Sequence, residues 1–292
     1  MRSAGSSGSS RRPFELKLRS RVMALEGRAR VMGVLNITPD SFSDGGRYLD
    51  PAEAERRALR LESEGADLLD VGGESTRPGA RPVSAREELR RVLPVLKRLK
   101  GRIGVPLSID TTKYDVASAA FDHGVEILND ITALGSDRRI ARLVARMGAA
   151  VVLMHMRGRP KTMQLDTRYT DVVREVRDHL RGAAHRALEA GIGTGRIVLD
   201  PGFGFGKDAS QNLELLSRLE EFATLGHPLL VGVSRKSFIG HLLGEPVDRR
   251  LHGSIGAAVV AAIKGARIVR VHDVLAHRQA LALVEAAGER RP

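Results

Sequence analysis

The hydrophobic and polar positions repeat in one order from Ala29 to the end of the chain: a short apolar run, a loop rich in Gly, Pro, Asp or Asn, and a longer stretch with helical spacing. Short apolar runs bounded by turn residues are typical of buried strands, whereas apolar residues spaced by one helical turn are typical of helices. The pattern predicts strands at 30–36, 68–72, 105–110, 126–129, 150–155, 197–200, 228–233 and 267–272. It predicts helices at 52–64, 85–99, 114–122, 137–147, 171–190, 210–220, 250–264 and 275–287.

Eight strands alternating with eight helices predict an α/β fold, a closed (β/α)8 TIM barrel. A doubly wound open sheet would usually carry a G-x-G-x-x-G turn after its first strand, and residues 36–46 contain no such turn. Alternating residues at 14–19 and 22–25 predict a short N-terminal β-hairpin. Residues 1–13, rich in Ser, Gly and Arg, are expected to form a disordered tail. We therefore expect one domain over residues 14–292.

Composition agrees with a folded chain outside the membrane. Of the 292 residues, 42% are hydrophobic and 28% are charged, which is enough for a large core. No apolar run approaches the ~20 residues that cross a bilayer, so no membrane segment is expected. The chain has no cysteine, which rules out disulfides and thiolate metal sites. This is compatible with the reducing cytoplasm, where we expect the protein to act.

The net charge of +12 raises the possibility of nucleic-acid binding. The basic residues are scattered along the predicted helices, however, and only 3% of residues are aromatic, whereas a stacking platform for single strands needs aromatic side chains. We therefore expect no nucleic-acid partner.

Residues 10–14 look like the start of a twin-arginine export signal, but the residues that follow are charged and alternating instead of apolar, so we reject this interpretation.

Polar or ionisable residues follow every predicted strand. In barrels of this type the active site is built at the C-terminal ends of the strands. The residues at those ends are Asn36, Glu74, Asp110, Asn129, Asp130, Met154, His155, Asp200, residues 234–237, Arg270, His272 and Asp273. Any one of them could simply cap a helix or form a turn. Their convergence on one rim indicates a site.

The stretch 197–207 ends a strand with Asp200 and continues into the glycine-rich loop PGFGFGK. Glycine-rich loops after strands can bind phosphate, which is the first interpretation of this loop. The ends of the last two strands suit phosphate better, because Arg270 and His272 point to the same face there. Arg235, in the same region, is interpreted as part of an outward structural ion pair.

A buried carboxylate such as Asp200 needs hydrogen-bond donors to remain charged. A ligand edge with two adjacent N–H groups, such as that of an aminopyrimidinone, would supply them. Asp110 and Asn129 could complete the recognition of such a flat heterocycle, with Met154 as an apolar surface against it. His155 and His185 are interpreted as structural, because no metal-ligand spacing surrounds them.

Loops 38–46 and 74–79 are rich in small, polar and bending residues. They could be lids that close over a substrate and exclude water, or ordinary flexible connections.

The motifs LNITPDSFSDGG, GGESTRPGA, SIDTTK, ILNDI, LMHMRGRPKTMQ, LDPGFGFGK, GVSRKSFIG and IVRVHDV follow one another between Val31 and Val274. In this order they resemble the motifs of dihydropteroate synthase. The resemblance implies a pterin-binding barrel that condenses 6-hydroxymethyl-7,8-dihydropterin pyrophosphate with p-aminobenzoate. It also implies Mg²⁺ as cofactor, small molecules as substrates and a homodimer.

The resemblance assigns roles to named residues. The implied pterin site is Asp110, Asn129, Met154, Asp200 and Lys236. The implied pyrophosphate site is Asn36, Arg270 and His272, with Asn36 also a ligand of Mg²⁺. The implied p-aminobenzoate site is Phe42, Thr76, Arg77, Pro78, Phe205, Lys236 and Ser237, with Asp44 on the same lid as Phe42. The residues expected to be catalytic are Asp110, Lys236, Arg270 and His272.

On this view the glycines of PGFGFGK do not bind phosphate. They allow close backbone approach, and Phe205 forms an aromatic wall beside the second substrate. Two alternatives stay open: a corrinoid-linked methyltetrahydrofolate methyltransferase-like domain, and a catalytically silent pterin-binding paralogue.

Overall fold

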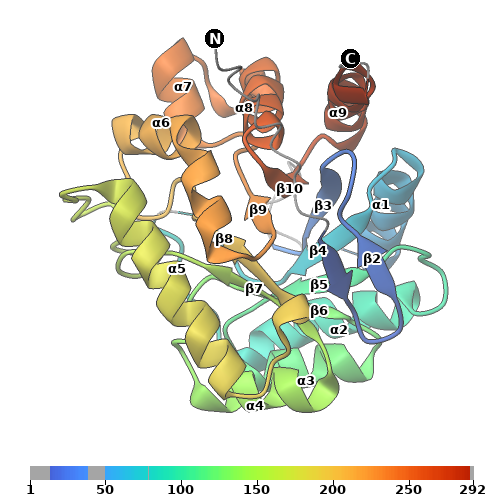
Figure 1. Cartoon of the computed structure of the whole chain (residues 1–292). Helices are drawn as coiled ribbons and strands as arrows, with labels where there is room; N and C mark the ends of the chain where they lie inside the picture. The colour runs from blue at the N-terminus through green and yellow to red at the C-terminus, as the bar shows by residue number, and fades with distance from the viewer. Residues whose placement is uncertain (1–13, 39–49, 78, 290–292) are drawn as a thin grey trace, which may run out of the picture.

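The computed structural model describes residues 14–38, 50–77 and 79–289, and its centre is a closed barrel of parallel strands (Figure 1). The barrel strands are β3 (Arg30–Asn36), β4 (Leu68–Gly72), β5 (Leu107–Asp110), β6 (Ile127–Asp130), β7 (Ala150–Met154), β8 (Ile197–Asp200), β9 (Leu229–Val231) and β10 (Ala266–Val271). Each strand pairs with the next in the chain, and β10 pairs with β3 to close the ring. The predicted (β/α)8 barrel is confirmed.

Helices surround the barrel. They are α1 (Pro51–Ser63), α2 (Ala85–Leu99), α3 (Tyr114–Asp122), α4 (Arg138–Met147), α5 (Val172–Glu189), α6 (Ala209–Ser217), α7 (Ser237–Leu243), α8 (Leu251–Ile263) and α9 (Val274–Glu289). Several of them begin at a side-chain cap, such as Asp208, which forms a reciprocal capping box with Gln211 before α6. No described helix is long and apolar enough to cross a membrane.

Most predicted elements agree with the structure to within one or two residues at each end, and larger corrections are needed after β8 and after β9. The predicted helix 210–220 ends at Ser217, and the chain continues as a 3-10 turn over Leu219–Leu225. The short α7, at the end of the seventh barrel strand, was not predicted, because seven residues are too few to show a helical period. The tail proposed for residues 1–13 lies outside the described residues.

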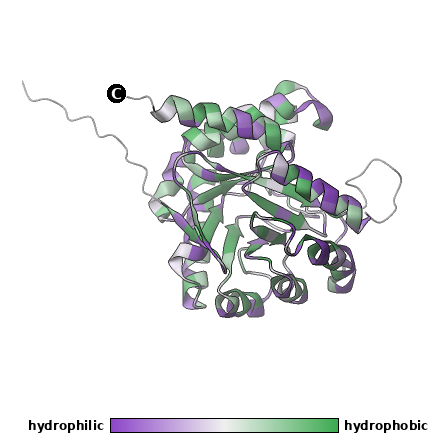
Figure 2. Cartoon of the chain, turned by 90° about the vertical axis from the view of Figure 1, so that its right-hand side faces the viewer, coloured by the Kyte–Doolittle hydropathy of each residue, from purple (hydrophilic) through white to green (hydrophobic). Residues whose placement is uncertain are grey.

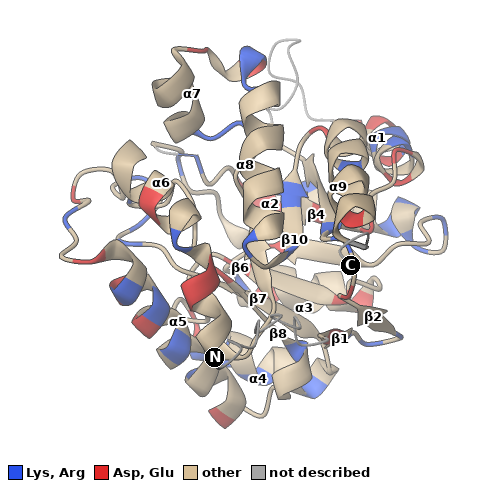
Figure 3. Ribbon diagram, turned by 45° about the horizontal axis from the view of Figure 1, so that its top comes forward, with Lys and Arg blue, Asp and Glu red and all other residues tan. Residues whose placement is uncertain are grey.

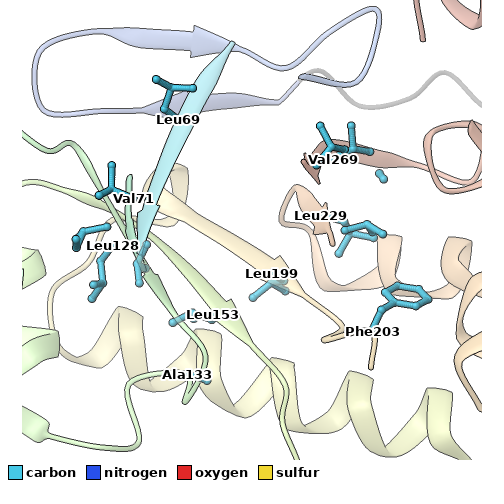
Figure 4. Packing of buried hydrophobic residues seen from close by; sticks show 14 of the residues in the cluster. Leu69, Val71, Leu128, Ala133, Leu153, Leu199, Phe203, Leu229 and Val269 are labelled. Carbon is cyan, nitrogen blue, oxygen red and sulfur yellow. The ribbon is translucent and has the colours of Figure 1, made fainter. Parts of the chain in front are cut away.

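Hydrophobic residues fill both sides of the strands. Figure 2 shows that the strands are mostly hydrophobic, while the surrounding helices also carry hydrophilic residues. Alternate strand residues such as Leu69, Val71, Leu128 and Leu199 face outward and pack in the cluster between strands and helices (Figure 4). The residues between them face the barrel interior, because side chains alternate along a strand.

At the end of the barrel where the strands begin, the interior is apolar and covered by the N-terminal hairpin. The hairpin is formed by β1 (Glu15–Lys17) and β2 (Val22–Ala24), which confirms its prediction. Its residues Leu16, Leu18 and Leu25 form one buried cluster with the inward residues Met32, Leu68, Ile127, Ala150, Val152, Val198, Leu230 and Ile268. We call this cluster the apolar plug.

Polar contacts hold the hairpin over the plug. Arg19 donates hydrogen bonds to the carbonyl oxygens of Phe121 and Val125 at 2.6 and 2.9 Å. The backbone and hydroxyl of Ser20 both donate to Glu126 at 2.9 Å. The hairpin therefore closes one end of the barrel, and a ligand of the interior has to enter at the end where the strands finish.

We expect Leu16→Ala to lower the free energy of unfolding by about 2–4 kcal/mol, because it opens a cavity in a closed apolar cluster. Val22, in the same hairpin, is 58% exposed, and Val22→Ala should change stability by no more than about 0.5 kcal/mol. Urea denaturation of both variants measures the difference. Equal effects would show that the hairpin is not part of the core.

Candidate active site

At the end where the strands finish, the inward positions change from apolar to polar. Two residues separate successive inward positions on a strand. On β4, β6, β8 and β10 the plug residues Leu68, Ile127, Val198 and Ile268 are followed at that spacing by Asp70, Asn129, Asp200 and Arg270. The barrel interior is therefore apolar in its lower half, where the strands begin, and polar in its upper half, where the strands finish.

The centre of the polar half is a hydrogen-bonded network around Asp70. Arg270 Nε donates to Asp70 Oδ2 at 2.7 Å, and Asn129 Nδ2 donates to the same oxygen at 3.0 Å. Arg270 also donates to Asp110 Oδ2 at 3.1 Å. The Asp70 side chain is 0% exposed. The structure therefore brings together Asp110, Asn129 and Arg270 as predicted, and adds Asp70.

Asp70 was not among the residues predicted from the sequence. The available signal was a carboxylate in the middle of the apolar strand LLDVG, since a charged group at a buried position requires partners. The prediction placed site residues at strand ends and on the loops that follow them, and Asp70 lies two residues before the end of β4.

Burial shifts the pKa values of three groups in the polar half, Asp110, Asp200 and Lys236, toward neutral pH. Burial and the neighbouring Asp70 raise the pKa of Asp110 to about 7. Burial raises the pKa of Asp200 to about 6, against a hydrogen bond of 2.7 Å from the Gly202 N–H. Burial and the adjacent Arg270 lower the pKa of Lys236 to about 8. These groups can therefore change protonation near physiological pH.

The PGFGFGK loop packs tightly against the segment that follows β7. A Cβ on Gly202 would overlap the carbonyl oxygen of His155, and one on Gly206 would lie 2.8 Å from the carbonyl oxygen of Arg157. Both glycines have a positive φ, of 70° and 66°. The loop's glycines thus permit close backbone approach, as expected from the resemblance.

Lys207, at the end of this loop, is a second residue whose role was not predicted. Its buried Nζ lies 2.9 Å from the carbonyl oxygen of Gly202, 3.1 Å from that of Phe205 and 3.0 Å from His155 Nδ1. Burial lowers its pKa to about 7. These contacts hold the glycine loop against the segment after β7. His155 is one of the contacting residues, which agrees with its interpretation as a structural residue.

Phe205 and Met154 line the upper interior. They form a small buried cluster with Ile131 and Met163. Lys236 Nζ lies 4.2 Å from the centre of the Phe205 ring, which is a cation–π distance. The structure therefore joins Met154, of the predicted pterin site, to Phe205, of the predicted p-aminobenzoate site, within one cluster.

His272 is held by Ser234. The Ser234 hydroxyl accepts from the His272 backbone N–H at 3.3 Å and lies 3.1 Å from His272 Nδ1. Burial lowers the pKa of His272 to about 3, so the ring is neutral. Because the Ser234 hydroxyl accepts from the backbone N–H, its own hydrogen is free to be donated to Nδ1. This hydrogen-bond network assigns the ring proton to Nε2. The Nε2–H group of His272 is then an uncharged hydrogen-bond donor.

Arg235 forms an ion pair with Asp273, with contacts of 2.6 and 3.0 Å, which confirms its interpretation as a structural residue. Lys236 lies immediately before α7, and Ser237 is exposed as the first residue of that helix.

The loop after β4 is anchored by charge. Lys113 contacts Glu74 and the fully buried Glu88, each at 2.5 Å, and Glu74 also accepts from the Val83 backbone N–H. Thr76 is half-buried and Arg77 is exposed on this loop. The predicted lid residues Phe42, Asp44 and Pro78 lie outside the described residues.

Asn36 ends β3 and lies beside Gly72, where its Oδ1 is 3.5 Å from the position of a Cβ on that glycine. Over residues 14–38, 50–77 and 79–289 no cluster of three or more His, Cys, Asp or Glu side chains is placed to hold a metal ion.

The fold and this site define a pterin-binding barrel. The family model of pterin binding enzymes matches residues 32–272. The dihydropteroate synthase of Escherichia coli (strain K12) is 48% identical over 256 residues, which cover 88% of this chain and 90% of that protein.

Solved structures agree. Xanthomonas albilineans dihydropteroate synthase with 4-aminobenzoic acid has a TM-score of 0.89 and 45% identity, covering 96% of this chain and 100% of that one. Dihydropteroate synthase from Thermus thermophilus in complex with 6HMPPP has a TM-score of 0.81 and 48% identity, covering 93% and 99%. The chain belongs to the dihydropteroate synthase family. The predicted family and its enzyme class are confirmed, which decides against the corrinoid alternative.

We expect Gly202→Ala to cost about 3 kcal/mol or more of stability, because it combines an unfavourable φ with a backbone overlap. Gly226 has nearly the same φ, 71°, but a Cβ there would meet nothing within 4 Å. Gly226→Ala should therefore cost only the φ penalty, about 1 kcal/mol. Chemical denaturation of the two variants isolates the overlap, and equal losses would mean that the loop is not closely packed.

Proposed function

We propose that this chain condenses 6-hydroxymethyl-7,8-dihydropterin pyrophosphate with p-aminobenzoate, forming 7,8-dihydropteroate and pyrophosphate for folate synthesis. The observation that carries the proposal is the position of Asp200, a buried carboxylate at the end of β8 that faces the barrel interior, where the charges of Lys236 and Arg270 act on it. Its hydrogen bond from Gly202 uses only part of its accepting capacity.

The pterin would bind with its donor-rich edge toward Asp200. The 2-amino and ring N–H groups of a dihydropterin match the acceptors of Asp110, Asn129 and Asp200. Lys236 would supply a donor to the ring, and Met154, which lies in the apolar cluster with Phe205, would pack against the ring face. Charge-assisted pairs of this kind are strong in a buried site.

The pyrophosphate would bind beside Arg270 and His272. Arg270 is fixed by two carboxylates and keeps donors for an anion, since a guanidinium has five N–H groups. The neutral His272 adds a hydrogen bond without charge. These donors stabilise the negative charge that develops as the pyrophosphate leaves the 6-methylene carbon.

Mg²⁺ fits this site as a partner of the substrate. Magnesium is commonly held by one or two protein oxygens together with phosphate oxygens, so a full protein cage is not needed. Asn36 Oδ1 would be such a ligand, and bound Mg²⁺ would offset charge on the pyrophosphate.

The amine of p-aminobenzoate then forms a bond to the methylene carbon from which pyrophosphate leaves, and the nitrogen gives up one N–H proton to the released pyrophosphate. An aniline nitrogen is uncharged at neutral pH, so the reaction needs no strong base in the site. Phe205 and Lys236 would flank the p-aminobenzoate, with Ser237, Thr76 and Arg77 at the mouth. Phe42 and Pro78 complete this pocket in the prediction, where closed loops would exclude water from the reactive carbon.

We also propose a homodimer. Its support, besides the resemblance, is a group of exposed apolar side chains on the neighbouring helices α8 and α9: Val260, Ile263, Leu275 and Leu283. Helix α8 carries no Lys, Arg, Asp or Glu over Leu251–Ile263 (Figure 3). Such a face suits contact with a second copy.

The cytoplasmic location stays a prediction from the sequence.

Asp200→Asn is expected to weaken binding of the dihydropterin pyrophosphate by about 100-fold or more, because a charged pair to the pterin edge is lost. Isothermal titration calorimetry measures this. Asp208→Asn is the matched control, since Asp208 caps α6 in the same loop and Asn caps a helix equally well. Retained affinity in Asp200→Asn would remove Asp200 from the pterin site.

Pterin affinity should also fall as the pH is lowered from about 8 to about 5. Asp110 and Asp200, with pKa values of about 7 and about 6, take up protons over this range, and each then loses accepting capacity. The neutral His272 should not contribute, because its pKa is about 3, and Lys236, with a pKa of about 8, is protonated over most of this range. Calorimetry across this range tests the expectation, and an affinity that stays constant contradicts it.

A further inference from the structure

We propose that Asp70 is a positioning residue that sets the hydrogen-bonding direction of Asn129 and the orientation of Arg270, so that pterin and pyrophosphate recognition depend on the same carboxylate. The inference rests on the proposed function and deepens it. Asp70 itself lies below the rim, two residues before the end of β4 and without exposed surface, and is therefore argued to act through its neighbours.

One oxygen of Asp70 makes both contacts. Asp70 Oδ2 accepts from Arg270 Nε at 2.7 Å and from Asn129 Nδ2 at 3.0 Å. The two donors come from β10 and β6, on opposite sides of β4 in the order of the barrel. A single buried carboxylate thus joins strands that belong to different predicted subsites.

The contact with Asp70 fixes the direction of the Asn129 amide. A carboxylate accepts hydrogen bonds and repels a carbonyl oxygen, so the amide nitrogen has to face Asp70. The amide oxygen then points away from Asp70 and is presented as an acceptor. Together with Asp110 and Asp200 it makes the pterin edge of the site rich in acceptors, which selects a ligand edge rich in N–H donors.

The same carboxylate holds Arg270. The Nε contact with Asp70 and the Nη2 contact with Asp110 lock two sides of the planar guanidinium. An Arg side chain otherwise has many conformers, so this pairing spares the entropy of ordering it when an anion binds. Without Asp70, Arg270 would keep its charge but lose its fixed direction.

A contribution to stability explains the buried charge of Asp70 less well than the positioning of Asn129 and Arg270 does. A buried ion pair contributes little net stability on average, because desolvation opposes the attraction. Asp70 also raises the pKa of Asp110 and leaves its own Oδ1 without a hydrogen-bond partner among the described residues. An apolar residue would fit the surrounding pattern of β4 better, so the carboxylate is explained by the groups it directs.

The test uses two separate ligands with the full-length protein. Inorganic pyrophosphate reports on Arg270, and 6-hydroxymethyl-7,8-dihydropterin, which has no phosphate, reports on Asn129. By calorimetry, Asp70→Asn should weaken both by about tenfold or more, since each site loses a charge-assisted contact. Asn129→Ala should weaken mainly the pterin, and Arg270→Ala mainly pyrophosphate.

Ser108→Ala is the matched control. Ser108 lies opposite Asp70 in the strand register, is also fully buried, and its hydroxyl has no hydrogen-bond partner among the described residues. This variant should bind both ligands as the wild type does. Melting temperatures within a few degrees of wild type show that the variants are folded, and Asp70→Ser replaces Asp70→Asn if the latter does not fold.

Loss of both affinities in a folded Asp70 variant, with neither lost in Ser108→Ala, supports the inference. An Asp70 variant that binds both ligands within about threefold of wild type, or that loses only one of them, overturns it. Wild-type protein that binds neither ligand would refute the proposed function, and this inference with it.

Discussion

The structure depends on the alternation of inward-facing residues along the barrel strands. Each of four strands places an apolar residue in the plug and a polar one two positions later, as in Leu68 and Asp70 of β4. The hairpin seals the apolar half. In the polar half the charged groups are themselves buried and desolvated, so they have to pair with one another or with a ligand. The Asp70–Arg270–Asp110 network is the result.

That constraint explains how the site can work. Desolvation brings the pKa values of Asp110, Asp200 and Lys236 close to neutrality, and it strengthens each hydrogen bond that a ligand makes there. Groups held in advance cost little to organise when substrate binds. Lys207 contributes to this organisation without being one of the predicted site residues, because its contacts fix the glycine loop that carries Phe205.

The sequence predicted the barrel, its hairpin and most of the converging residues, because strand ends and motif order can be read locally. It did not reveal Asp70, whose importance comes from partners 59 and 200 positions away. The glycine loop was first interpreted as a phosphate site. Instead, Gly202 and Gly206 allow the loop to approach the carbonyl oxygens of His155 and Arg157, and this packing against another loop cannot be read from the local sequence. Helix α7 was missed because it is short and held by its surroundings.

The most direct test of the proposed function is release of pyrophosphate from 6-hydroxymethyl-7,8-dihydropterin pyrophosphate by the wild-type protein, with and without p-aminobenzoate. We predict rapid release that depends on p-aminobenzoate and yields dihydropteroate in equal amount, because in the proposed function both substrates bind at the open end of the barrel and Arg270 and His272 stabilise the leaving group. Tight binding of the pterin without p-aminobenzoate-dependent release would contradict it and would indicate a catalytically silent pterin-binding protein.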